Sequence, residues 1–209
     1  AEMCGNGIRC VVRLAVDRGH APGPRVAVQT LAGTRHCERL GGDLVRVGMG
    51  RPEFDPAACG LSPRPGIPVE QRGGTTALNF DGVVGIVVAV GTPHLVSFSD
   101  QPVSIAFASH HGARIETHPA FPKRVNVQFA TRVAPDRVSV RTWERGAGLT
   151  EACGTGACAV FAAGRALGLL SEAASLALPG GELRIEEGPG GEILKTGPAT
   201  IVFEGVWAG

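Results

Sequence analysis

The sequence has almost no excess of either charge, because 20 lysines and arginines are balanced by 19 aspartates and glutamates. Proteins that bind the phosphate backbone normally carry a basic excess, so charge gives no reason to expect nucleic acid as a partner. Long apolar runs are also missing. The longest, Val83 to Val90, is far shorter than the roughly 18 to 20 residues that cross a bilayer. We therefore predict no membrane partner.

The first residues, Ala-Glu-Met-Cys-Gly, do not start with methionine and do not show the charged and then apolar pattern of a secretory leader. We expect no signal peptide, and we expect the chain to start inside a longer protein. Six cysteines would suit a disulfide framework in a small secreted domain, but 209 residues with 44% apolar content can build a core without one. Reduced thiols and a cytoplasmic protein are expected.

Signatures of cofactors and metals are missing too. No Gly-x-Gly-x-x-Gly turn follows a predicted strand, and no lysine stands out as an attachment point for pyridoxal phosphate. His110, His111 and His118 lack the cysteine or carboxylate spacing of a metal site, and a solvated loop is the favoured interpretation. The sequence predicts neither a cofactor nor a metal.

A short internal repeat is the clearest positive feature. The segment Cys4-Gly5-Asn6-Gly7 reappears as Cys153-Gly154-Thr155-Gly156, and Glu2 and Glu151 stand two residues before the two cysteines. Apolar residues at helical spacing follow each copy. The repeat therefore predicts two similar lobes, with both motif cysteines at helix N-termini.

Most of the remaining chain favours strands, because apolar and polar residues alternate. The alternating segments are Val26 and Val28, Val45 and Val47, Val125 with Val127 and Phe129, Val138 and Val140, Leu183 and Ile185, and Ile201 and Phe203. Strand is expected to exceed helix.

Glycine and proline mark the expected lobe boundaries. The proline-rich stretch from Arg51 to Gly74 predicts an irregular crossing, with the boundary near Met49. A second break at 188–191, followed by Gly197-Pro198, would return the last strand to the first lobe. Residues 1–48 with 198–209 are expected to form the first lobe, and 49–197 the second.

A cysteine before Gly-x-Gly at a helix start has specific chemistry. The first N–H groups of a helix lack internal partners and carry the positive end of the dipole, so a thiol there loses its proton more easily and anions are held nearby. One such cysteine could be a small buried residue. Two on repeated scaffolds favour thiols acting on opposite faces of one carbon, which would invert its stereochemistry. Cys4 and Cys153 are therefore the candidate catalytic pair.

Removal of an amino-acid α-proton is difficult for a thiol, because that hydrogen is many pKa units less acidic than the thiol at about 8.5. The site must therefore stabilise a carbanion. Two helix N-termini aimed at the substrate carboxylate would supply oriented N–H donors, each worth roughly 2.7 to 4 kcal/mol in a site without water.

Two segments resemble the signature segments of the diaminopimelate epimerase family: 3–10 and 143–159. The second includes Trp-Glu-Arg-Gly-Ala-Gly ahead of its cysteine, which the related proline racemases do not share. Weaker similarities at 47–52, 91–94, 121–126 and 178–181 extend the resemblance over essentially the whole chain. The resemblance implies an isomerase that interconverts L,L-2,6-diaminopimelate and meso-diaminopimelate without a cofactor, on the route to lysine and peptidoglycan precursors.

The same resemblance implies an α+β fold of two pseudo-symmetric lobes, each a curved mixed or antiparallel sheet wrapped around a central helix. The active site would lie in the cleft between them, and the protein would be a homodimer. The family's N-terminal segment has no counterpart in this sequence. The first lobe is therefore expected to be incomplete.

Carried over position by position, the resemblance makes Cys4 and Cys153 the acid and base, and His94 and Glu144 would adjust their protonation. The residues implied to contact substrate are Gly5, Asn6, Thr92, Asn126, Glu144, Arg145, Gly154 and Thr155. Arg145 would pair with the distal carboxylate of the substrate. Thr92 stands where the family usually has asparagine, so that contact is expected to be lost or bridged by water.

Other interpretations remain open. An isomerase of simpler amino acids, like the proline racemases, fits the paired cysteines, but its substrate has no distal carboxylate for Arg145. A non-catalytic thiol or metal-binding protein is less favoured, since Cys-x-x-Cys spacing is absent. His94 and Asn126 could be structural residues that satisfy neighbouring polar groups, and Glu144 with Arg145 could be a surface pair.

Overall fold

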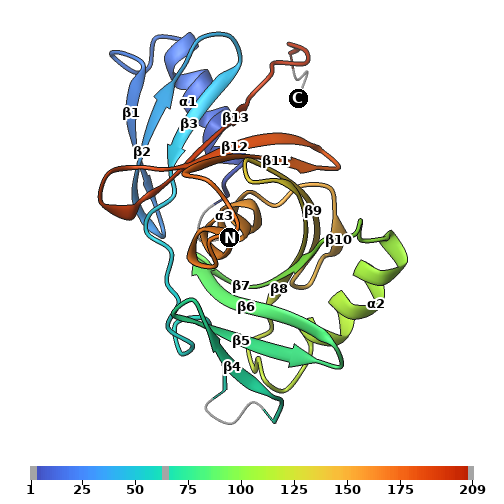
Figure 1. Ribbon diagram of the computed structural model, residues 1–209. Helices are drawn as coiled ribbons and strands as arrows, with labels where there is room; N and C mark the ends of the chain where they lie inside the picture. The colour runs from blue at the N-terminus through green and yellow to red at the C-terminus, as the bar shows by residue number, and fades with distance from the viewer. Residues whose placement is uncertain (1–3, 63–65, 207–209) are drawn as a thin grey trace.

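The computed structural model describes residues 4–62 and 66–206, and places thirteen strands in one continuous mixed sheet (Figure 1). The helices are α1 (Gly7–Asp17), α2 (Ile105–Glu116) and α3 (Gly154–Ala166), with a short 3-10 turn η1 (Pro189–Gly191). The strands are β1 (Arg25–Thr30), β2 (Gly33–Arg39), β3 (Leu44–Gly48), β4 (Val69–Arg72), β5 (Thr75–Phe80), β6 (Val83–Val90), β7 (Thr92–Ser99), β8 (Asn126–Ala134), β9 (Arg137–Glu144), β10 (Gly148–Thr150), β11 (Ala173–Leu178), β12 (Gly181–Glu187) and β13 (Ile193–Pro198). None of the helices in these described ranges is long and apolar enough to cross a membrane.

The first lobe is a three-stranded antiparallel sheet with α1 on one face. The order is β1-β2-β3, and α1 buries Ile8 and Val12 against these strands. The helix ends where Gly19 adopts a positive φ of 71°, a conformation that costs glycine little. Val11 and Leu14, on its outer side, remain exposed. The predicted first helix, with its stop at Gly19, is confirmed.

The second lobe wraps its sheet around α3, which lies inside the curve formed by β6 to β9 and β11 to β13 (Figure 1). The helix contacts β6, β7, β8, β12 and β13, and every residue from 156 to 164 is buried. A helix covered on all sides needs apolar side chains on all sides, and a closely wrapped sheet favours small ones. Between its bounds α3 holds only glycine, alanine, cysteine and threonine besides Val160, Phe161 and Arg165. The predicted second helix is confirmed.

Strand β13 joins the two lobes. It pairs antiparallel with β12 on one side and with β3 on the other, where Lys195 lies opposite Val47. The strand that reaches the first lobe is thus Ile193–Pro198, although the sequence predicted 193–197 for the second lobe and the return after Gly197-Pro198. The structure therefore has the predicted α+β fold with two lobes.

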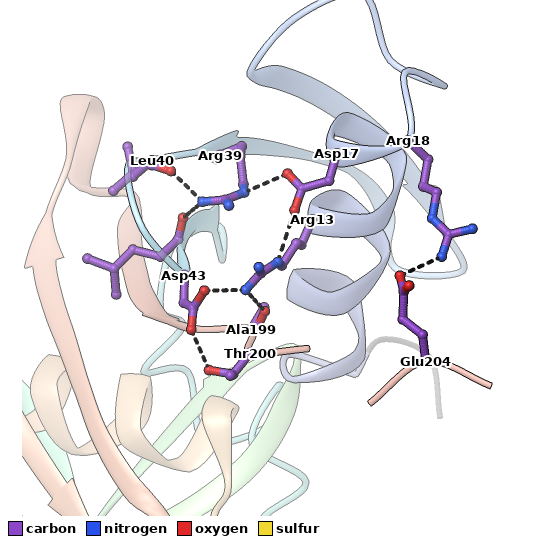
Figure 2. A network of polar contacts seen from close by, with 10 residues as sticks. Arg13, Asp17, Arg18, Arg39, Leu40, Asp43, Ala199, Thr200 and Glu204 are labelled. Atoms are coloured by element: carbon purple, nitrogen blue, oxygen red, sulfur yellow. Dashed lines mark hydrogen bonds and ion pairs between the residues drawn. The ribbon is translucent and has the colours of Figure 1, made fainter. Parts of the chain in front are cut away.

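The segment after β13 runs along α1 rather than forming a further strand (Figure 2). Arg13 binds the Asp43 carboxylate and donates to the Ala199 carbonyl at 2.6 Å, and Thr200 donates to Asp43 at 2.8 Å. The predicted strand at Ile201 and Phe203 is therefore wrong. The described residues after Pro198 belong to no strand, and the side chains of Ile201 and Phe203 are exposed. The assignment of 198–209 to the first lobe stays a prediction, and 207–209 lie outside the described residues.

Helix α2 occupies the outer side of the second lobe, where the sequence was interpreted as a solvated loop. Ser104 caps it by accepting the Phe107 N–H at 3.1 Å. His110 and His111 lie within this helix and His118 just beyond it, so the loop prediction is wrong for the first two. The helix packs on Trp143 of β9, because Gly112 leaves no side chain between them.

Replacement of Gly112 by alanine should destabilise the protein, although alanine normally favours a helix. An added methyl group would lie 2.6 Å from Trp143 Cβ, so the cost of overpacking, about 1 to 3 kcal/mol, should exceed the propensity gain of about 1 kcal/mol. Urea denaturation measures the difference. Ser109→Ala on the same helix is the control and should change the free energy of unfolding little. Equal stability of both variants would contradict this packing.

Candidate active site

The two repeated motifs form matching helix starts. The Gly7 N–H donates to Cys4 Sγ at 3.3 Å, and the Gly156 N–H donates to Cys153 Sγ at 3.4 Å. In each motif the sulfur thus accepts the N–H of the residue three positions later, and Cys153 is the N-cap of α3. The prediction that the motif cysteines lie at helix N-termini is confirmed for Cys153, whereas Cys4 lies two residues before Asn6, the N-cap of α1.

These helix starts adjoin one another although they are far apart in the sequence. A methyl group built on Gly154 would lie 3.7 Å from Gly5 Cα and 3.4 Å from Asn6 Oδ1. The structure therefore brings Gly5 and Asn6 together with Gly154 at one place between the lobes. The positive ends of two helix dipoles meet there, which favours a bound anion.

The two cysteines differ in their surroundings. Cys4 is exposed, whereas Cys153 is 5% exposed. Burial, and then the nearby negative charge of Glu144, raise the pKa of Cys153 to about 11, against the opposing hydrogen bonds from Thr155 and Gly156. The helix start alone therefore does not ionise this thiol, contrary to the expectation from sequence, because desolvation of a thiolate outweighs two hydrogen bonds.

A chain of hydrogen-bonded polar side chains leads from Thr142 of β9 to Cys153. Thr142 donates to Gln128 Oε1 at 2.6 Å, and Gln128 Nε2 lies 3.2 Å from His94 Nδ1. His94 Nε2 lies 3.0 Å from Thr92 Oγ1. The chain continues through Thr155, whose Oγ1 is 3.5 Å from both Thr92 Oγ1 and Cys153 Sγ.

This chain assigns the tautomer of His94. Since Gln128 Oε1 accepts from Thr142, its amide nitrogen must donate to His94 Nδ1, which leaves the proton on Nε2 for donation to Thr92. His94 lies within β7 and has no exposed surface. Burial, assisted by the charge of Arg145, lowers its pKa to about 3. The imidazole is thus a neutral link two side chains away from Cys153.

Asn126 and Arg145 form the neighbouring edge of the site. The Asn126 amide donates to the Pro93 carbonyl at 3.1 Å and accepts the Arg145 N–H at 2.9 Å. Both ends of that amide therefore bind backbone, as the structural interpretation of this residue expected. The Arg145 guanidinium is exposed and donates to the Lys123 carbonyl at 3.2 Å. The roles of both residues in substrate binding stay predictions.

Glu116 at the end of α2 fixes the turn that presents Glu144 and Arg145. Its carboxylate accepts the Trp143 indole N–H at 2.7 Å and the Gly146 N–H at 2.9 Å. Glu144 itself accepts the Thr150 hydroxyl at 2.6 Å. Helix α2, which the sequence did not indicate, therefore positions two residues that the sequence singled out.

Comparison with known proteins decides the family. The sequence model described as diaminopimelate epimerase matches residues 86–202. A diaminopimelate epimerase from Carboxydothermus hydrogenoformans is 44% identical over 207 residues, which covers 98% of this chain and 73% of that protein. A second diaminopimelate epimerase, from Cyanothece sp., is 42% identical over 211 residues, which covers 98% of this chain and 74% of that protein. The chain belongs to the diaminopimelate epimerase family.

A solved structure also resembles this member of the diaminopimelate epimerase family in its fold. A probable proline racemase from Agrobacterium radiobacter K84 superposes with a TM-score of 0.62 at 16% identity, covering 94% of this chain and 65% of that one. At such identity the match concerns architecture only. The predicted α+β fold with two lobes is confirmed, and so is the resemblance to the family.

Three residues of the site were missed in the sequence. Gln128 and Thr142 are buried polar members of the hydrogen-bonded chain, and Lys195 is buried beneath the two helix starts. A signal for Lys195 was present, since it stands with Ile193 and Gly197 at alternate positions of one strand and so shares their inward face. No group of three histidine, cysteine or acidic side chains in 4–62 and 66–206 could hold a metal.

Burial of neutral His94 should make stability depend on pH. The pKa of His94 is about 3 in the folded protein, against an ordinary value of 6.5 that applies to the unfolded chain. The unfolded chain therefore binds more protons between these values, and the free energy of unfolding should fall as pH drops below about 6.5. Melting temperatures at pH 7 and pH 5 measure the loss. The loss should be smaller in His94→Gln than in the control His20→Gln, whose side chain is exposed. The same pH dependence in both variants would refute a buried neutral imidazole.

Proposed function

We propose that this protein is an epimerase that interconverts L,L-2,6-diaminopimelate and meso-diaminopimelate without a cofactor, with Cys4 and Cys153 as acid and base. The observation that supports it most directly is the meeting of two Cys-Gly-x-Gly helix starts, at Gly5 and Gly154, in a member of this family. The isomerase class itself follows from the family. The route to lysine and peptidoglycan precursors follows from the substrate.

The proposed reaction exchanges one proton for another at the substrate α-carbon. The thiolate of one cysteine removes the α-proton, and the thiol of the other delivers its proton to the opposite face. The electron pair of the broken C–H bond is held meanwhile as a carbanion conjugated with the α-carboxylate. N–H groups at the two helix starts stabilise the growing charge on that carboxylate, and this stabilisation is strongest in the transition state.

Thiolate formation at Cys153 requires a change in its surroundings, because burial raises its pKa to about 11. We propose that the substrate ammonium group supplies that change by placing a positive charge beside the sulfur. Glu144 opposes ionisation of the thiol and so suits the proton-donating form of Cys153. Thr155 and the Gly156 N–H favour the thiolate, which lets the same residue serve in both directions.

Recognition of the distal end of the substrate is assigned to the edge formed by Asn126, Glu144 and Arg145. The Arg145 guanidinium is exposed, and among the described residues its only acceptor is the Lys123 carbonyl, which leaves further donors for a carboxylate. Thr92 already binds His94 and Thr155 with its hydroxyl. Its contribution to substrate binding is therefore proposed to be indirect.

The enzyme is further proposed to act in the cytoplasm, as a homodimer, on a small-molecule substrate and without a cofactor. All six cysteines are free thiols in the structure, which fits a reducing compartment. Neither nucleic acid nor a membrane is proposed as a partner. Sedimentation analysis of the full-length protein tests the dimer.

Replacement of either catalytic cysteine should abolish exchange of the substrate α-proton. The full-length protein, with reductant and L,L-diaminopimelate in heavy water, should place deuterium at the α-carbon, as followed by proton NMR. Cys153→Ala and Cys4→Ala should each lower that rate at least about 100-fold, the usual contribution of a general acid or base. Cys10→Ala is the matched control, since that thiol is also exposed on α1 but lies outside the motif. Exchange into proline alone would instead indicate a racemase of that substrate.

Removal of the Glu144 charge should make Cys153 more reactive toward alkylation. Glu144 raises the pKa of this thiol, so Glu144→Gln should increase the thiolate fraction at pH 8 and with it the rate of reaction with iodoacetamide. Mass spectrometry of the peptide that contains Cys153 gives the rate. Glu182→Gln, at an exposed position of β12, is the control. An unchanged rate in Glu144→Gln would show that the Glu144 carboxylate does not raise the pKa of the Cys153 thiol.

A further inference from the structure

Lys195 lies at the point where the two helix starts meet, and no part of it is exposed. Strand β13 points its side chain inward, and Nζ donates to the Gly5 carbonyl at 3.1 Å. A methyl group on Gly5 would overlap this nitrogen, and one on Gly154 would lie 2.6 Å from it. The ammonium therefore fits only because both motif positions are glycine.

A second buried cation converges on the same carbonyl oxygen. Arg9, which is 7% exposed, donates from Nη1 to the Gly5 carbonyl at 3.2 Å and from Nε to the Pro198 carbonyl at 3.1 Å. Neither Arg9 nor Lys195 forms an ion pair with any carboxylate in the part of the chain that the structure describes. Two positive charges are thus buried side by side without a fixed counter-charge.

Such an arrangement is costly unless an anion compensates it, because a buried charge loses its hydration and two like charges repel each other. Lysine has three donors, and only the one to Gly5 has a described acceptor. The proposed reaction brings two kinds of negative charge to this place: a cysteine thiolate and the substrate α-carboxylate.

The Gly5–Asn6 peptide connects the two cations with the helix start. It is trans, like every described peptide bond, so its N–H points away from its carbonyl. Both cations bind the carbonyl side. The Asn6 N–H, on the opposite side, donates to no atom of the described residues. Positive charge on the carbonyl polarises the peptide and makes this N–H a stronger donor.

We propose that Lys195 is a positioning residue of the epimerase, whose ammonium acts through the Gly5–Asn6 peptide to stabilise the negative charge that develops on the substrate α-carboxylate and the active thiolate. This inference rests on the proposed function. It assigns Lys195 to catalysis rather than to stability, because burial of an unpaired charge disfavours folding.

The groups facing Lys195 are consistent with that role. Burial lowers its pKa, and the charge of Arg9 lowers it further, whereas Cys158, Cys153 and Cys4 raise it. Cys37 of β2 also faces the ammonium. The positive charge on Lys195 and a thiolate at a motif cysteine therefore stabilise each other. Lys195 keeps its proton most strongly when one of these cysteines is ionised.

Lys195→Met in the full-length protein removes the charge while keeping an unbranched side chain of similar length. We expect kcat for α-proton exchange to fall at least about ten-fold, the effect of one pKa unit on an ionised intermediate, with a smaller change in KM. Alkylation of Cys153 should need a higher pH than in the unaltered protein. The melting temperature should stay equal or rise, since a buried charge is gone. Leu194→Met, on the other face of the same strand, is the matched control.

The outcomes separate this inference from the function on which it rests. A folded Lys195→Met protein with unchanged kcat, or with lower kcat but an unchanged alkylation profile and a lower melting temperature, would overturn it, since Lys195 would then be structural. Failure of the unaltered protein to exchange diaminopimelate would remove the proposed function. The alkylation profiles of both proteins would still decide whether Lys195 stabilises the thiolate. Partial recovery of kcat in Lys195→Arg would support charge as the cause.

Discussion

The close approach of two helix N-termini, at Gly5 of the first lobe and Gly154 of the second, is the constraint on which the rest of this structure depends. Positive helix ends repel one another, and here Arg9 and Lys195 add two buried cations beside them. Folding must therefore hold this positive region together by other means. It does so with continuous sheet: β13 pairs with both β3 and β12, so one ladder of backbone hydrogen bonds runs from lobe to lobe.

The same constraint explains how the surroundings are built. Helix α3 can bring its N-terminus to the centre because the sheet encloses it, and enclosure requires small residues such as Gly156, whose added methyl group would lie 2.6 Å from the Gln128 amide. The buried polar chain from Thr142 to Thr155 then packs against that helix start with its hydrogen bonds satisfied. Helix α2 adds the outer support through Glu116. Helix α2 thus orients the turn after β9, and the buried polar side chains orient the start of α3.

Electrostatics give the two sides of the site different characters. Around Cys153, burial and Glu144 favour the neutral thiol, and His94 is held neutral by its own burial. Beneath Gly5, the buried cations favour any anion that arrives. In the proposed reaction, negative charge appears only briefly at the substrate carbon and its carboxylate, and a neutral thiol beside a region of positive potential suits such chemistry.

The sequence by itself determined the family, the two lobes and the two helix starts, because these rest on local signals: a repeated Cys-Gly-x-Gly and apolar residues at helical spacing after each copy. It also determined the strands with one solvated face, such as β1 and β9, where apolar and polar residues alternate. Only the tertiary structure decided the rest. Strand β6 is buried on both faces and therefore shows no alternation of apolar and polar residues. Helix α2 has a weak apolar pattern, because Trp143 fills the space over Gly112. Ile201 and Phe203 alternate with other residues as in a strand but belong to no strand in the described part of the chain. Lys195 lies far from both motifs in sequence, and only the pairing of β13 with β3 places its charge between them.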